Sequence, residues 1–434
     1  MNDENRQEMA ALLAAQQSRV TQIQDALLDW HEVTKRLGYV ALFEQFAATA
    51  AQRDVQHRLA RDEAVQIKAQ GFGALRLAQA DGGAGVSLPE LFFVVRDLAR
   101  ADPNIAHIFR NHFFAVEQHL AAPDTAFARR LLPQVAQGKT LGVAFNELTG
   151  EPAGAVGRTP GTQLEKDDTQ SGWRISGTKV YSTGNLYADY LLASVSDPDS
   201  GTVKQFFVAT DAPGVRLDDD WHGFGQKLTG SGTTVFDRVH VAPEDLFDTP
   251  PRPTVDTPWG PRVLFGFTFH QVYLTVIITG VVDRILADAL ALVGKRQRNY
   301  YHGLADLPAL EPEIQSTIGR IAAWRNAALA STDRAIHALD RAWQHRNDTN
   351  AYETSRLSTL AASEAKVVVD ETAATLASLL IDVASGSGVS TQAALDRHWR
   401  NIKVIASHNP RIYKERVLGD HYLNGTDLPT GAFF

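Results

Sequence analysis

A histidine and an asparagine stand where a helix is expected to stop. In the stretch RHWRNIKVIASHNP at 397–410, cations recur every third residue, which places them on one helix face, and Pro410 ends the helix. A histidine titrates close to neutral pH, so His408 is suited to donating or accepting a proton in a reaction. A histidine near a helix end also commonly caps carbonyl groups or lies exposed, and the residues alone leave both interpretations open.

Three further short motifs carry polar groups suited to a ligand. Thr183 follows a predicted strand, and its hydroxyl both donates and accepts hydrogen bonds. The TGSG stretch at 229–232, which contains Ser231, offers backbone N–H groups and small side chains that suit a phosphate. Arg296 and Arg298 present planar donor groups that match phosphate oxygens. An ordinary turn, a hairpin and a solvated helix end explain the same three motifs equally simply.

Composition excludes several classes of function. The chain has 434 residues, no cysteine and a formal net charge of −8, with its lysines and arginines dispersed. Disulfides, thiol catalysis and cysteine zinc sites are therefore excluded, and a nucleic-acid surface is disfavoured. His107 and His112 are five residues apart and no HExxH motif occurs, so we predict no metal.

The N-terminus lacks the apolar region of a signal peptide. The longest apolar run, VYLTVIITGVV, is shorter than the roughly 20 residues that cross a membrane. We therefore expect a soluble, cytoplasmic protein.

The chain divides into three regions that must position these motifs. Residues 1–138 have a helical composition, whereas residues 139–246 hold short runs rich in β-branched and aromatic residues between turn sequences. Four prolines at 247–258 indicate an extended linker. Residues 259–434 have a helical pattern. Apolar residues there recur at spacings of three and four, as in one buried face of a helical bundle, and they are Leu357, Leu360, Ala361, Ala365, Val368, Leu376, Leu379, Leu380 and Val383. We predict an α+β multidomain protein whose central part is antiparallel β structure, a small barrel or a sandwich.

The order helices, β domain, helices resembles the acyl-CoA dehydrogenase fold: a helical N-terminal domain, a β-barrel and a C-terminal four-helix bundle. Five blocks carry the resemblance in the same order: DGGAGVS at 81–87 with the helix after it, LGVAFNELTGEPAG at 141–154, ISGTKVYSTGNLYADYLL at 175–192, GFGQKLTGSGTTVFDRVHV at 223–241, and SGSGVSTQAALDRHWRNIKVIASHNP at 385–410.

The resemblance implies a flavin site. The residues expected to line the flavin are Phe145, Asn146, Tyr181, Ser182, Thr183, Ser231 and Ser385. Arg296 and Arg298 resemble an arginine cluster that reaches the flavin phosphate from a neighbouring subunit. A homotetramer is implied in the same way. The implied cofactor is reduced FMN, with FAD as the other possibility.

One departure favours a particular branch of the superfamily. True acyl-CoA dehydrogenases use a carboxylate base, and Asn409 stands where one large group carries that glutamate. An amide cannot act as this base. The stretch around His408, with YKERVLGDHYLNGTDLPTG after it, resembles instead the two-component flavin-dependent monooxygenases, such as dibenzothiophene monooxygenase. In these enzymes a separate reductase supplies reduced flavin, O2 adds to it, and the resulting C4a-hydroperoxyflavin oxygenates a substrate.

This branch implies catalytic roles for His408 and Thr183 and a small organosulfur or aromatic substrate. His112, Phe113 and Asn409 are candidate substrate-pocket residues, with His112 and Phe113 equally interpretable as packing residues. An acyl-CoA dehydrogenase or oxidase with tightly bound FAD and a base on another helix remains an alternative. A helical scaffold that has lost its cofactor is a third possibility.

Overall fold

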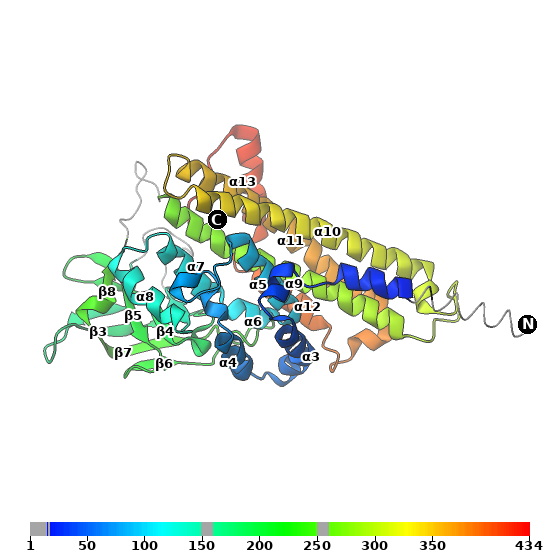
Figure 1. The fold of residues 1–434 in the computed structure, drawn as a ribbon, viewed down its shortest axis with the longest axis horizontal. Coiled ribbons are helices and arrows are strands. Elements are labelled where there is room, and N and C mark those ends of the chain that lie inside the picture. The colour runs from blue at the N-terminus through cyan, green and yellow to red at the C-terminus, as the bar shows by residue number, and fades with distance from the viewer. Residues whose placement is uncertain (1–14, 16–17, 149–158, 250–259) are drawn as a thin grey trace, which may run out of the picture.

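The computed structural model describes residues 15, 18–148, 159–249 and 260–434, and Figure 1 shows their arrangement. The N-terminal part is helical, as expected. Its α-helices and 3-10 helices are α2 (Glu32–Arg36), α3 (Val40–Gln56), α4 (Arg61–Ala69), η1 (Phe72–Ala74), η2 (Gln79–Asp81), α5 (Leu88–Ala101), α6 (Pro103–Ile108), α7 (Arg110–Leu120) and α8 (Ala126–Ala136).

A single curled eight-stranded sheet follows the first helices. Its strands and short helices are β1 (Leu141–Ala144), β2 (Gln163–Lys166), β3 (Trp173–Lys179), η3 (Asn185–Tyr187), β4 (Tyr190–Asp197), β5 (Thr202–Ala209), β6 (Val215–Leu217), β7 (Thr234–Val241), η4 (Pro243–Asp245) and β8 (Leu246–Asp248). The strand order is β6-β7-β3-β2-β4-β5-β8, with β1 paired to β4. Apolar side chains of alternate residues, among them Ile175, Phe206 and Phe236, fill the interior of the curl.

Long helices form the C-terminal bundle and extend away from the sheet (Figure 1). They are α9 (Pro261–Lys295), η5 (Pro308–Leu310), α10 (Pro312–Gln344), α11 (Ala351–Ala384), η6 (Ser385–Val389), α12 (Asp396–Ala406) and α13 (Arg411–Asn424). Helix α9 is long and lies in the middle of the bundle, where it packs against α5 as well as α10 and α11. Among the described residues, no helix is both long and apolar enough to cross a membrane.

The predicted apolar stripe on α11 is partly wrong. Ala361, Ala365 and Leu380 are buried in the bundle core, as predicted from their spacing. Leu357 and Val368 were included in the same stripe, but both side chains are exposed. The buried face of a helix covers only part of its circumference. Residues that are three or four positions from their neighbours can still lie at the edge of that face, where they are exposed.

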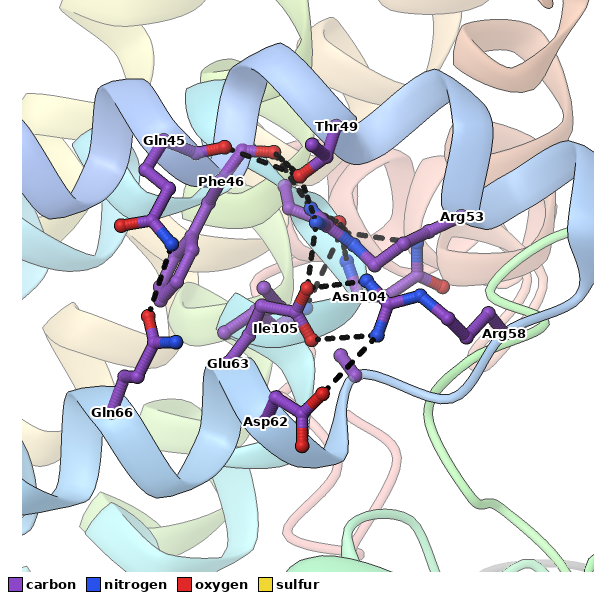
Figure 2. A network of polar contacts seen from close by, with 12 residues as sticks. Gln45, Phe46, Thr49, Arg53, Arg58, Asp62, Glu63, Gln66, Asn104 and Ile105 are labelled. Atoms are coloured by element: carbon purple, nitrogen blue, oxygen red, sulfur yellow. Dashed lines mark hydrogen bonds and ion pairs between the residues drawn. The ribbon is translucent and has the colours of Figure 1, made fainter.

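Helices α5 to α7 lie between the bundle and the sheet, and a buried ion-pair network fixes the start of α6. Figure 2 shows Arg53 of α3 beside Glu63 and Asn104. The Arg53 guanidinium donates to Asp102 Oδ2 at 2.7 Å and to Glu63 Oε1 at 3.0 Å. The other oxygen of Asp102 caps α6 by accepting from the Asn104 backbone N–H at 2.9 Å. Asn104 Oδ1 accepts in turn from the Leu228 backbone N–H at 3.2 Å, which ties α6 to the TGSG loop.

Candidate active site

His408 lies in the short connection between α12 and α13, which Pro410 separates. The His408 backbone N–H donates to the Ile405 carbonyl at 3.2 Å, so the residue extends the last turn of α12. Its imidazole approaches the first residue of α7: Arg110 Nη1 lies 3.3 Å from His408 Nε2. On another side, the Phe433 ring meets the imidazole edge-on, with ring centroids 5.3 Å apart.

The contact with Arg110 corrects the expected protonation of His408. His408 is an exposed residue, but protein groups from several elements crowd its ring. This desolvation, followed by the positive charges of Arg110 and other neighbours, holds the pKa of His408 well below its ordinary value near 6.5. His408 is therefore neutral at pH 7 rather than poised near neutrality. A guanidinium only donates, so His408 Nε2 accepts and the proton of the neutral ring is on Nδ1.

Thr183 belongs to a chain of buried hydroxyl groups. Its Oγ1 lies 2.8 Å from Ser231 Oγ, which lies 2.7 Å from Thr229 Oγ1. Thr229 Oγ1 donates to the Gln226 carbonyl at 2.9 Å. The predicted turn at Thr183 and the TGSG loop are thus one structural unit. Asn111, the residue after Arg110, donates from Nδ2 to the Thr183 carbonyl at 2.9 Å and joins this unit to α7.

Gln226 connects the hydroxyl chain to two helices. Its Oε1 lies 3.0 Å from His107 Nδ1 on α6, and its backbone N–H donates to Asn401 Oδ1 on α12 at 2.7 Å. The Gln226 backbone has a φ of 50°, a left-handed conformation uncommon for a residue with a side chain. This strain, held by contacts to α6 and α12, is typical of a functional site.

The structure brings the strand-end residues together as predicted from the resemblance, although their role stays a prediction. Residues 145–146 follow β1, and the Asn146 carbonyl accepts from the Val180 backbone N–H at 2.9 Å, beside the 181–183 stretch. Phe145 is half-buried against the sheet-side core. Tyr181 is exposed, has a φ of 55° and meets Trp221 edge-on. The Ser182 hydroxyl is buried and without a hydrogen-bond partner among the described residues.

Arg296, Arg298 and Ser385 are not near His408 in the same chain. His270 lies near the start of α9 and Arg296 directly after its end, which separates them by about 39 Å at 1.5 Å per residue. Arg296 Nη1 donates to the Val383 carbonyl at 2.9 Å at the end of α11. Ser385 contacts Tyr300 there through their hydroxyl groups. These residues form a second group at the far end of the bundle.

The candidate pocket residues occupy interior positions. His112 is 1% exposed, and both ring nitrogens are engaged: Nε2 donates to the Gly73 carbonyl at 2.8 Å, and Nδ1 accepts from the Leu141 backbone N–H at 3.2 Å. Phe113 is 0% exposed in the main core. Both residues are therefore packed in the interior, and their role as substrate-pocket residues stays a prediction. Asn409 is buried beside His408, and its Nδ2 donates to Gln271 Oε1 at 3.0 Å.

Sequence reasoning missed several residues of this site. Burial and the charge of Arg110 lower the pKa of His107 to about 3 and that of His270 well below 6.5, so both rings are neutral. His270 stacks on Phe114 with ring centroids 4.0 Å apart. One available signal was the His–Gln pair at 270–271 in an otherwise apolar helix; another was the arginine of FRNHFF.

The polar groups fit a flavin ring, whose edge presents both donors and acceptors. Several buried polar atoms around the site have no partner among the described residues: Ser182 Oγ, His107 Nε2, Arg110 Nε, Gln226 Nε2, His270 Nδ1, Gln271 Nε2 and Asn409 Oδ1. Buried polar groups are normally paired, so such a concentration indicates ligand-facing groups. Ser182 and Thr183 would hold the ring edge.

The helices, curled sheet and bundle, with a site where the three regions meet, define the architecture of the acyl-CoA dehydrogenases. Two family models match the chain: the acyl-CoA dehydrogenase N-terminal domain over residues 41–139 and its C-terminal domain over residues 273–410. Together they cover more than half of the chain.

Similar proteins share this architecture over nearly their whole length. The probable FMNH2-dependent monooxygenase SfnC of Pseudomonas putida is 28% identical over 396 residues, which cover 90% of this chain and 94% of SfnC. Dibenzothiophene monooxygenase of Rhodococcus erythropolis is 25% identical, over 88% of this chain and 92% of its own. The structure of methanesulfinate monooxygenase MsuC from Pseudomonas fluorescens has the same fold, with a TM-score of 0.80, 24% identity and coverage of 93% and 100%.

The chain therefore belongs to the acyl-CoA dehydrogenase superfamily, in its branch of two-component flavin-dependent monooxygenases. It is accordingly an oxidoreductase that uses reduced FMN.

Proposed function

We propose that this chain is the oxygenase component that receives reduced FMN from a separate reductase and transfers one oxygen atom of O2 to a small organosulfur or aromatic substrate. The reaction takes place at His408, in the cytoplasm, as a step of sulfur metabolism. The observation that carries this proposal is the assembly of one polar site from α7, the 181–183 and 226–231 stretches and the α12 end, through the contacts of Arg110 and Asn111.

The residues of the site have distinct roles. When bound, reduced FMN supplies the electrons that activate O2. Thr183 and Ser182 orient the ring edge. Neutral His408 presents its Nδ1–H as a donor, while Arg110 fixes the ring by donating to Nε2. A proton donor held in place beside the flavin suppresses the side reaction that releases hydrogen peroxide.

The second group of residues implies a shared site. Arg296, Arg298 and Ser385 are too far from His408 to serve the same flavin within one chain. We propose that they reach the flavin phosphate of a neighbouring subunit in a homotetramer. We also propose that the chain divides into three domains, at residues 1–138, 139–246 and 259–434, as expected from the sequence.

An acyl-CoA dehydrogenase reaction is the alternative, and it requires a carboxylate base. Asn409 occupies the relevant end of α12. Asp370, a described carboxylate in this part of the bundle, is ion-paired with Lys366 at 2.6 Å. The pairing disfavours Asp370 as a free base.

The experiment is single-turnover mixing. The purified protein is loaded with reduced FMN without oxygen and mixed with oxygenated buffer containing an organosulfur probe, and oxygenated product and hydrogen peroxide are both quantified. Wild-type protein and His337→Ala, which changes an exposed histidine on α10, should give product. His408→Ala should release mainly peroxide. Reduction of bound FAD by an acyl-CoA, with no oxygenated product, would instead establish the alternative.

A further inference from the structure

Arg110 differs from the other buried arginines of the described residues. Arg53 pairs with Glu63 and Asp102, Arg96 with Asp333, and Arg397 with Asp288. Arg110 is only 6% exposed, yet no carboxylate of the described residues lies within ion-pair distance. Its side-chain contact there is with the neutral His408 ring, and its Nε has no partner.

A buried cation without a counter-charge is costly unless something compensates it. Arg110 does not escape the cost by losing its proton, because burial lowers its pKa only to about 10. The surrounding rings of His107, His270 and His408 are neutral for the reason given above. The described part of the site therefore carries one uncompensated positive charge, which an anionic ligand would balance.

Two glutamine side chains add donors of the kind that an oxyanion needs. Gln226 Oε1 is engaged by His107, and Gln271 Oε1 accepts from Asn409. Because both Oε1 atoms are engaged, the orientation of each amide is fixed, and its NH2 group is left to bind a ligand. Both NH2 groups are buried and have no partner in the described part of the chain. This part of the site therefore holds one charged and two neutral donor atoms that have no acceptor among the described residues.

We propose that Arg110 binds the anionic head group of the substrate, and that the substrate is a small organic acid with a forked oxyanion, such as a sulfinate, rather than a neutral aromatic or thioether. A planar guanidinium matches two oxygens of such a group. The reaction of this substrate rests on the proposed oxygenase function, whereas the binding of the anion does not.

The reaction balances for a sulfinate. The sulfur lone pair forms a new S–O bond with one oxygen atom of O2, the O–O bond breaks, and sulfinate is oxidised to sulfonate. The second oxygen atom leaves as water with the two hydrogens and two electrons that reduced FMN supplies. In this step Arg110 holds the substrate oxygens and leaves the sulfur free to react.

The test measures binding to the cofactor-free protein by calorimetry. The probes are benzenesulfonate, which cannot react further, and methyl phenyl sulfone, its neutral counterpart. Wild-type protein should bind the sulfonate at least tenfold more tightly than the sulfone. Arg110→Gln should abolish that preference, and Arg110→Lys, which keeps the charge without the fork, should retain part of it. Arg36→Gln, at an exposed arginine, is the matched control.

Equal binding of both probes, or a sulfonate preference that survives in Arg110→Gln, would overturn the inference. Loss of reduced-FMN binding in Arg110→Gln without any sulfonate preference in wild-type protein would also overturn it, because the flavin would then be the counter-ion. Single-turnover assays with benzenesulfinate and methyl phenyl sulfoxide separate the two proposals. Coupled oxygenation of the sulfoxide alone contradicts the anionic substrate and supports the oxygenase. Peroxide alone from both probes contradicts the oxygenase, and the calorimetry still decides whether Arg110 binds an anion.

Discussion

Arg53 and Arg110 lie in the same helical region, and both guanidinium groups are almost completely buried, but their surroundings differ. Arg53 donates to Glu63 and to the Phe46 carbonyl oxygen (Figure 2), and also to Asp102. Arg110 contacts a neutral histidine and has no carboxylate partner among the described residues. The fold compensates one charge internally and leaves the other to a ligand. Burial alone therefore does not separate a structural arginine from a functional one, whereas the presence of a counter-charge does.

The paired arginine should give the largest loss of stability. Arg53→Met leaves the buried Asp102 and Glu63 without their shared cation, and breaking a buried pair from one side costs about 3–5 kcal/mol. The midpoint of urea unfolding should fall accordingly. Arg36→Met removes an exposed ion pair to Glu90 and should cost less than about 1 kcal/mol. An Arg53→Met protein as stable as Arg36→Met would contradict the structural role.

His408, which contacts Arg110, should matter for catalysis rather than for stability. His408→Ala removes the acceptor of Arg110 and the Nδ1–H donor, and loss of a positioned proton donor lowers rates by about 100-fold. Coupled product formation should fall by that factor, while the unfolding midpoint stays close to that of wild-type protein. His408→Gln, whose amide oxygen also accepts from Arg110, should retain part of the activity. Unchanged coupling in His408→Ala would remove His408 from the mechanism.

Buried neutral histidines should make the stability of the protein sensitive to acid. Like the two arginines, they test how the fold responds to a buried positive charge, but their charge appears only at low pH. Burial lowers the pKa of His112 from 6.5 to about 4. The unfolded chain therefore binds the proton first, and stability is lost as pH falls below about 6.5. His112 alone should contribute a loss of about 2 kcal/mol between pH 7 and pH 5. The slope of unfolding free energy against pH should decrease by almost one proton near pH 5.5 in His112→Gln, and an unaltered slope would contradict the assignment.

The hydroxyl chain should give the smallest effect. Thr183→Val keeps the shape of the side chain but removes its hydrogen bond to Ser231, which is worth about 1 kcal/mol. Reduced-FMN binding, measured anaerobically by fluorescence, should weaken about fivefold. Thr183→Ser keeps the hydroxyl group and should bind as wild-type protein does. Equal binding by the valine and serine variants would place the flavin edge elsewhere.

The sequence predicted the order of helices, sheet and bundle because periodicity and turn composition are local properties. Through the resemblance it also predicted a catalytic role for the His408 stretch, and that role stays a prediction. It did not predict the neutrality of His408 or the contact of the buried Arg110 with this histidine. Both depend on the contact between Arg110 at the start of α7 and His408 after the end of α12, two residues that are 298 positions apart in the chain. The apolar neighbours of His112 likewise gave no indication that both of its ring nitrogens are engaged.

The most direct test is equilibrium unfolding of the cofactor-free protein with Arg53→Met and Arg110→Met measured side by side. Removal of a paired buried charge should destabilise by about 3–5 kcal/mol, whereas removal of an uncompensated one should change stability by less than about 1 kcal/mol or increase it. The Arg110→Met protein should nevertheless lose coupled oxygenation. An Arg110→Met protein destabilised as strongly as Arg53→Met would contradict the account, because Arg110 would then be a structural residue.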